Sequence, residues 1–177
     1  MEKTVFVPIF GMAMTSRKHK PLYTLEERRR RDATRWTLVQ GILAPVQFLA
    51  CLVSTILVLH TLTTGRGYEL TTASILLKVA LLYSIMATGA IWEKVVFGQY
   101  LFAPAFFWED VVSFVVIALH TIYLWGFLSG SMGVETQMLV TLAAYAAYVV
   151  NAAQFLLKLR AARQDASLDF RIKEVRS

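Results

Sequence analysis

Four long apolar runs dominate this chain of 177 residues, of which 56% are hydrophobic. A soluble domain is usually about 45–50% apolar, and here the excess lies at about residues 37–62, 71–92, 111–128 and 136–157. A helix needs roughly 18 or more apolar residues to cross a bilayer. The sequence therefore predicts an all-α fold, an integral membrane bundle of four transmembrane helices.

Charge separates the two ends of the chain from its middle. Residues 1–35 carry nine Lys and Arg and residues 158–177 carry six, whereas only Arg66, Lys78 and Lys94 lie between them. Four spans place both termini on one side, and basic flanks favour the cytoplasmic side. The same rule explains the net charge of +6, so no nucleic-acid partner is expected.

The predicted domain organisation is simple. Residues 1–22 form a flexible arm, residues 23–163 a single four-helix membrane domain, and residues 164–177 a basic tail. Thr24 and Glu27 fit a capping box, which predicts a basic amphipathic helix from about Leu25 that continues into the first span. Pairs between Glu26 and Arg30 and between Glu27 and Arg31 would support that helix.

Polar residues inside the first two spans are sparse. Gln40, Gln47, Cys51 and Ser54 recur on one face of the first span, which predicts a polar stripe that faces the bundle. Helix–helix hydrogen bonding explains this stripe at least as well as ligand contact does. Lys78 lies near the predicted start of the second span, and we expect its side chain to extend to the interface. Cys51 is the single cysteine, so it forms no internal disulfide.

The stretch from Trp92 to Asp110 joins the second and third spans. It contains seven aromatic residues, three carboxylates (Glu93, Glu109 and Asp110) and one lysine. An aromatic belt with solvated charges at helix ends is one interpretation. A functional site is the interpretation that we favour, because ionisable groups at membrane depth are functional candidates.

The predicted topology brings polar side chains together in the cytoplasmic half of the bundle. They are Gln40, Thr88, Glu93, Glu109, Asp110, Ser113, Asn151 and Gln154. The aromatic stretch would form the roof of this pocket. Glu109, Ser113 and His120 share one helical face, but Glu109 and His120 are about 16 Å apart along the helix. Only a large flat ligand would contact both. A haem held by His60 and His120 is disfavoured, because the two histidines lie at different depths.

Three segments carry a family resemblance. Residues 36–49 (WTLVQGILAPVQFL), 91–114 (IWEKVVFGQYLFAPAFFWEDVVSF) and 143–156 (AAYAAYVVNAAQFL) closely resemble the 3-vinyl (2-vinyl) bacteriochlorophyllide hydratase family of phototrophic bacteria. The resemblance runs from about Tyr23 to Arg163. It implies a lyase that hydrates the C3 vinyl group of chlorophyllide a or 3-vinyl bacteriochlorophyllide a to a 1-hydroxyethyl group, on the route to bacteriochlorophyll a.

The resemblance also implies the surroundings of the enzyme. We expect a multi-pass protein of the bacterial inner (intracytoplasmic) membrane, in contact with lipids and with other enzymes of the bacteriochlorophyll pathway. No cofactor is expected, and Mg enters only as part of the substrate macrocycle. A non-catalytic pigment carrier or assembly subunit of the photosynthetic membrane is the alternative.

Hydration of a vinyl group requires an acid that protonates the terminal carbon and a base that helps water attack. We expect Glu93 or Glu109 to be the proton donor, the other to orient water, and His120 to hold the pigment, as a possible axial ligand to its Mg. Asp110 is expected to cap the helix that follows. The propionate of the substrate would meet Lys94 or Arg35. The full set of expected substrate-binding residues is Trp92, Lys94, Tyr100, Phe106, Phe107, Trp108, Asp110, Ser113, Asn151, Gln154 and Gln40, with Phe97 and Phe102 as further aromatic walls.

Overall fold

The computed structural model describes residues 22–176. The regular secondary structure of these residues consists of α-helices, and they contain no strand. The five helices are α1 (Leu25–Ala33), α2 (Arg35–Thr64), α3 (Tyr68–Phe97), α4 (Phe107–Ser129) and α5 (Val134–Arg176). The all-α prediction is confirmed. The expected flexible arm at residues 1–22 lies outside the described residues except for Leu22.

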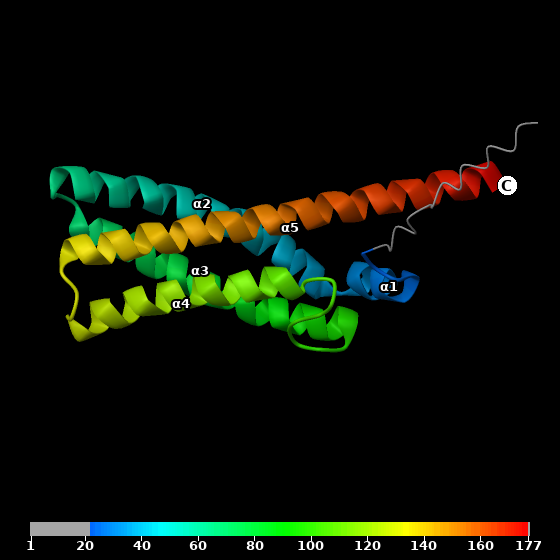
Figure 1. Ribbon diagram of the computed structural model, residues 1–177, viewed down its shortest axis with the longest axis horizontal. Coiled ribbons are helices and arrows are strands. Elements are labelled where there is room, and N and C mark those ends of the chain that lie inside the picture. The colour runs from blue at the N-terminus through cyan, green and yellow to red at the C-terminus, as the bar shows by residue number, and fades with distance from the viewer. Residues whose placement is uncertain (1–21, 177) are drawn as a thin grey trace, which may run out of the picture.

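Four of these helices are long and apolar enough to cross a membrane. They are α2, α3, α4 and residues Val134–Gln164 of α5, and each contains one of the four predicted spans. Helices α2 and α3 form one antiparallel hairpin and α4 and α5 form another, and the backbones run closest within each hairpin (Figure 1). Helix α5 continues past the bundle through the predicted basic tail (Figure 1).

Helix α1 is basic and begins with the predicted capping box. The Thr24 side chain accepts the Glu27 N–H at 3.2 Å, and the Glu27 carboxylate accepts the Thr24 N–H at 2.8 Å. The pair between Arg30 and Glu26 forms at 3.2 Å. Glu27 is occupied by the cap, so Arg31 pairs instead with Asp32 at 2.8 Å.

The prediction that this basic helix continues into the first span is wrong. Thr34 is extended, with φ −87° and ψ 138°, and ends α1. Its side chain accepts the Trp36 N–H at 3.3 Å and so caps the start of α2. Threonine is a favoured N-cap because its hydroxyl satisfies an N–H that has no partner within the helix.

The polar stripe of the first span faces the bundle, as predicted. Gln47, Cys51 and Ser54 are buried. The Gln40 amide donates to the Thr88 hydroxyl at 2.8 Å. Ser54 bonds the Tyr145 hydroxyl at 2.7 Å and thereby ties α2 to α5. Gln40 and Ser54 therefore serve in helix–helix hydrogen bonding.

The prediction that Lys78 extends to the membrane interface is wrong. Its side chain is completely buried, donates a hydrogen bond to Gln47 and lies 3.6 Å from the centre of the Tyr148 ring. Helix α3 begins at Tyr68, so Lys78 lies about 15 Å along the helix axis. That depth is beyond the reach of a lysine side chain, and the residue faces the bundle.

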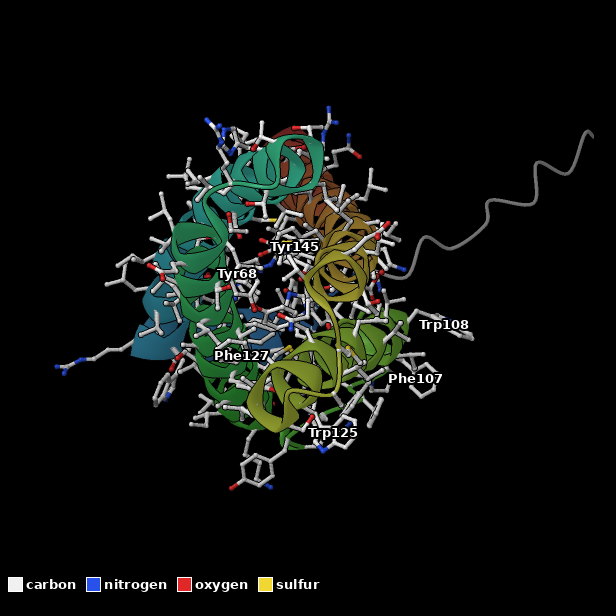
Figure 2. The ribbon with its side chains drawn as sticks, turned by 90° about the vertical axis from the view of Figure 1, so that its left-hand side faces the viewer. Tyr68, Phe107, Trp108, Trp125, Phe127 and Tyr145 are labelled. Carbon is white, nitrogen blue, oxygen red and sulfur yellow. The ribbon has the colours of Figure 1, made fainter. Side chains whose placement is uncertain are left out.

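The outer surface of the bundle is apolar. Helix α2, for example, exposes Leu49, Leu52, Val53 and Ile56 by about half or more of their surface. Figure 2 shows Trp125 pointing outward and Tyr145 pointing into the space that the four membrane helices enclose. Apolar residues outside and polar residues inside are typical of a bundle surrounded by lipid.

Candidate functional site

The loop between α3 and α4 brings the facing ends of these helices together. Helix α3 ends at Phe97, and Gly98 follows with φ 86° and donates its N–H to Lys94. Phe102 also has a positive φ of 59°, a conformation that is uncommon for a bulky residue. This backbone conformation turns the N–H groups of Phe102 and Ala103 inward, where each donates a hydrogen bond to a carboxylate.

Those carboxylates are Glu93 and Asp110, and they form a buried pair. Asp110 accepts the Phe102 N–H at 2.7 Å, and Glu93 accepts the Ala103 N–H at 3.2 Å. The two N–H groups belong to neighbouring residues, so the two carboxyl groups lie close together. Two carboxyl groups that share a buried site are most stable when one of them carries a proton. Such a pair can supply an acid and a base at one position.

The expectation that Asp110 caps helix α4 is wrong. The N-cap residue is Phe106, and no side chain caps this end. Asp110 is the fourth residue of the helix, so its carboxylate reaches back across the loop to Phe102 instead. Asp110, and not Glu109 as the sequence had suggested, is therefore the carboxyl group that lies beside Glu93.

Glu109 faces helix α5. Its carboxylate lies 3.2 Å from the Lys158 ammonium group. Its backbone carbonyl accepts from Asn151 at 2.9 Å and from Ser113 at 2.8 Å. Glu109, Ser113 and His120 are all buried on the predicted shared face. The structure therefore joins Ser113, Asn151 and Glu109 as expected, with Lys158 as an additional member.

The aromatic residues divide into two groups. The inner aromatic cluster comprises Tyr23, Trp92, Phe97, Phe106 and Phe155. Its rings lie 5.7–5.8 Å apart in the pairs Trp92–Phe106, Tyr23–Phe97 and Phe106–Phe155. This cluster packs directly against the loop that holds the carboxyl pair.

The outer group comprises Tyr100, Phe102, Phe107 and Trp108, all of which are exposed. Figure 2 shows Phe107 and Trp108 pointing away from the bundle. Of the five aromatic residues in the expected binding set, only Trp92 and Phe106 therefore lie at the inner face. The outer four have the exposure expected of aromatic residues at a membrane interface.

Tyr23 belongs to the inner cluster although the sequence did not single it out. It is buried, and the Arg31 guanidinium lies 4.7 Å from its ring centre. Burial raises the pKa of its phenol above the ordinary value, so the group stays neutral. Its position at the start of the family resemblance was the one indication available.

The remaining expected residues differ in their contacts. Lys94 is exposed and donates to the Gly98 carbonyl at 2.8 Å at the end of α3. The Trp92 indole donates to Thr37 at 2.9 Å and joins α3 to α2. Gln154 is half-buried, and its side-chain oxygen has no hydrogen-bond partner.

His120 lies deeper, with 1% of its surface exposed. Its Nδ1 is 2.7 Å from the Val116 carbonyl. A carbonyl only accepts, so Nδ1 carries the proton, and Nε2 of the neutral ring has a free lone pair. Nε2 is buried without a partner. A histidine oriented in this way is prepared to bind a metal through Nε2.

Comparison with known proteins identifies the family. Residues 23–161 match the family described as 2-vinyl bacteriochlorophyllide hydratase (BCHF). The chain belongs to this family. A 2-vinyl bacteriochlorophyllide hydratase of Cereibacter sphaeroides is 69% identical over 147 residues, which cover 83% of this chain and 91% of the relative.

A second relative supports the same assignment. The 2-vinyl bacteriochlorophyllide hydratase of Rhodobacter capsulatus is 68% identical over 148 residues, 84% of this chain and 86% of the relative. No solved structure matches the chain. Tyr23, the carboxyl pair, His120 and Lys158 all lie within the matched region of the hydratase family.

A surface cavity of about 260 Å³ lies at the opposite end of the hydratase bundle. Its lining residues are Thr61, Leu62, Gly65, Val134, Glu135 and Met138. None of these belongs to the expected site. The sequence reasoning also missed Lys78, Tyr145 and Tyr148 in the middle of the bundle. The indication in the sequence was the residue type, a lysine and two tyrosines inside otherwise apolar spans.

Proposed function

We propose that this chain is a membrane-bound hydratase that adds water to the C3 vinyl group of chlorophyllide a or 3-vinyl bacteriochlorophyllide a. The product would carry a 1-hydroxyethyl group. Family membership supports this reaction. The structural observation that supports the mechanism is the burial of Glu93 and Asp110 side by side, on the adjacent N–H groups of Ala103 and Phe102.

The carboxyl pair can complete the proton transfers of hydration without an external acid. The protonated member gives its proton to the terminal vinyl carbon, and the positive charge spreads from the adjacent carbon into the macrocycle. Water then attacks that carbon and passes a proton to the other carboxylate. One proton leaves the pair and one returns, so the next cycle begins with the same proton count.

The two glutamates have different roles in this proposal. Glu93 is the proton donor, in agreement with one of the two assignments made from the sequence, and Asp110 is the base. Glu109 is paired with Lys158, so its carboxylate acts as an acceptor that orients water or pigment. The inner aromatic cluster supplies an apolar wall close to the carboxyl pair.

His120 holds the pigment through Nε2, as an axial ligand to the Mg of the substrate. The Val116 carbonyl fixes the tautomer that this role requires. We propose no separate metal or redox cofactor, because hydration transfers no electrons and the macrocycle itself stabilises the cation. Activity that requires added nicotinamide, flavin or metal after gel filtration would contradict this mechanism.

The same proposal places the protein in the bacterial inner (intracytoplasmic) membrane with both termini and the α3–α4 loop on the cytoplasmic side. The basic ends of the chain support this orientation. Cysteines introduced near the two ends, with buried Cys51 replaced by serine, should react with an impermeant thiol reagent only after spheroplasts are opened. Labelling of either end in intact spheroplasts would refute the proposed orientation.

Absorption spectroscopy tests the reaction. Purified protein in detergent is mixed with chlorophyllide a, and loss of the vinyl group should shift the red band to shorter wavelength. Bound pigment with an unchanged spectrum and mass would instead support the alternative of a non-catalytic pigment carrier or assembly subunit. That alternative uses the aromatic cluster and His120 but does not need the carboxyl pair.

A further inference from the structure

Lys78 is a buried cation in the middle of the bundle. None of its surface is exposed, and no described Asp or Glu forms an ion pair with it. The Cys51 thiol and the His120 imidazole are close enough to interact electrostatically with it, and the Tyr148 ring lies 3.6 Å from its ammonium group. A buried charge without a counter-charge is costly, and in a membrane protein such a residue marks a functional site.

The surroundings of Lys78 come from all four membrane helices. Gln47 on α2 accepts its hydrogen bond, and Tyr148 on α5 places its ring 3.6 Å from the ammonium group. His120 on α4 completes the set, because it is close enough to Lys78 for their charges to interact, and its ring centre lies 5.8 Å from that of Tyr145. We call Gln47, Lys78, His120 and Tyr148 the Lys78 centre. The ring of Tyr148 favours a cation by its electron-rich face but does not neutralise it.

Unpaired donors in this centre point to an acceptor group. Gln47 is completely buried, and its Nε2 has no hydrogen-bond partner. Oε1 of the same amide accepts from Lys78, so Nε2 lies within a few ångströms of the ammonium group. An ammonium group has three donors and no acceptor. Two adjacent donor groups with one positive charge match a carboxylate.

We propose that the Lys78 centre binds the free carboxylate of a pigment whose metal is held by His120. This inference rests on the proposed function for the identity of the pigment, whose propionate is the carboxylate. It replaces the expectation that the propionate meets Lys94 or Arg35. Lys94 is exposed and bonded to Gly98, and Arg35 is exposed as well.

The order of these groups along the bundle suits one elongated ligand. Counted from the helix ends at the α3–α4 loop, Asp110 is three residues into α4, His120 is thirteen, and Lys78 is nineteen residues back along α3. These positions correspond to depths of about 5, 20 and 28 Å. Side chains lean toward the N-terminus of their helix, so Glu93 on α3 and His120 on α4 lean toward each other. A macrocycle at His120 thus has the carboxyl pair on one side and Lys78 on the other.

Paired ligands that differ only in charge test the proposal. Binding of chlorophyllide a and of its methyl ester to the full-length protein in detergent is measured by pigment fluorescence. The wild type should bind the free acid at least about tenfold more tightly than the ester, as expected for a charge-assisted bond in a buried site. Equal affinities in the wild type would overturn the proposal.

Three variants test which residues cause the tighter binding of the free acid. Lys78→Met should reduce it to about twofold or less, and Lys78→Arg should retain part of it. Gln47→Glu keeps the shape of the side chain and supplies an internal carboxylate, so it should weaken binding of the acid and leave the ester unchanged. It also tests the proposal if Lys78→Met fails to fold. A preference that survives in both Gln47→Glu and Lys78→Met, or that disappears in Lys94→Met, would overturn the assignment.

The binding assay is independent of turnover. A preference that depends on Lys78, in a protein that never hydrates the pigment, would leave this inference intact and refute the proposed function. Normal hydration, together with a preference for the free acid that does not depend on Lys78, would support the proposed function and refute this inference.

Discussion

The carboxyl pair and the Lys78 centre are both buried polar sites, yet they are built differently. Glu93 and Asp110 lie near helix ends, where the α3–α4 loop supplies a backbone N–H to each carboxylate. Lys78, Gln47 and His120 lie in helix interiors, where backbone N–H groups are already used by the helices. Their spare donors and acceptor must be satisfied by side chains or by a ligand.

This contrast assigns different tasks to the two sites. Groups with protein partners in place are preorganised, and preorganised polar groups are suited to act on developing charge during reaction. Buried groups without hydrogen-bond partners contribute most to the free energy of ligand binding, because leaving such a group unpaired is costly. We therefore expect changes in the carboxyl pair to affect turnover and changes around the Lys78 centre to affect binding.

The largest expected effect is on turnover in the carboxyl pair. Glu93→Gln should lower the hydration rate by about 100-fold or more, because the amide cannot donate the proton of the acid. Pigment affinity should change little. Stopped-flow absorption at saturating chlorophyllide measures the rate, and Glu109→Gln is the matched control, for which a loss of no more than about tenfold is expected. Normal turnover of Glu93→Gln would show that Glu93 is not the proton donor.

Asp110→Asn should lower turnover by a similar factor, since the base is removed. Residues that act as one unit have effects that do not add. The double variant Glu93→Gln/Asp110→Asn should therefore be no slower than the slower single variant by more than a few-fold. A loss in thermal stability alone, with normal turnover of Asp110→Asn, would show that this residue has a purely structural role.

His120→Ala should weaken chlorophyllide binding by about tenfold. The rate at saturation should stay within a few-fold of the wild type, because His120 is far from the carboxyl pair. Titration of the absorption spectrum measures the affinity, and the Soret band should also report loss of the axial nitrogen. Unchanged affinity and spectrum would remove His120 from the pigment site.

Lys158→Met tests a residue that supports the site without touching the carboxyl pair. It removes the ion pair with Glu109 and a hydrogen bond to the Ala105 carbonyl. Lys158 retains 31% exposure, so water can solvate part of the loss, and we expect about 1–2 kcal/mol of destabilisation. Thermal unfolding in detergent measures this value. A turnover loss as large as that of Glu93→Gln would place Lys158 in the chemistry.

The smallest effect is expected at Trp108, which points outward and is 68% exposed. Trp108→Ala should change pigment affinity by less than about twofold, because a lipid-facing anchor does not contact a ligand inside the bundle. The matched variant Trp92→Ala, in the inner cluster, should weaken binding several-fold more. If the two variants lose affinity equally, the pigment site extends to the outer surface of the loop.

The sequence predicted the helices better than the partners of individual side chains. Apolar length and basic flanks determine membrane spans with few competing solutions, and each predicted span lies within an observed helix. The break at Thr34 was missed, because a threonine inside a helical pattern is compatible with both continuation and capping. Lys78 was misplaced by an error in helix bounds. The predicted span began three residues after the true start of α3, which put the lysine closer to the interface than it is.

The pairing of Glu93 with Asp110 depends on the loop and could not be deduced from helix periodicity. Periodicity correctly placed Glu109 with Ser113 and His120. Asp110 was left without a partner because its contact requires the positive φ of Phe102, and that conformation is not favoured by the sequence.

Isotope labelling of the product tests the central claim most directly. The wild type is incubated with chlorophyllide a in D₂O, and in a parallel sample in oxygen-labelled water, and the pigment is analysed by mass spectrometry. We predict one deuteron on the new methyl carbon and one solvent oxygen on the adjacent carbon. The variant Glu93→Gln/Asp110→Asn should bind the pigment and label it at least about 100-fold more slowly than the wild type. Labelling by this double variant at the wild-type rate, or unlabelled pigment from the wild type, would contradict the account.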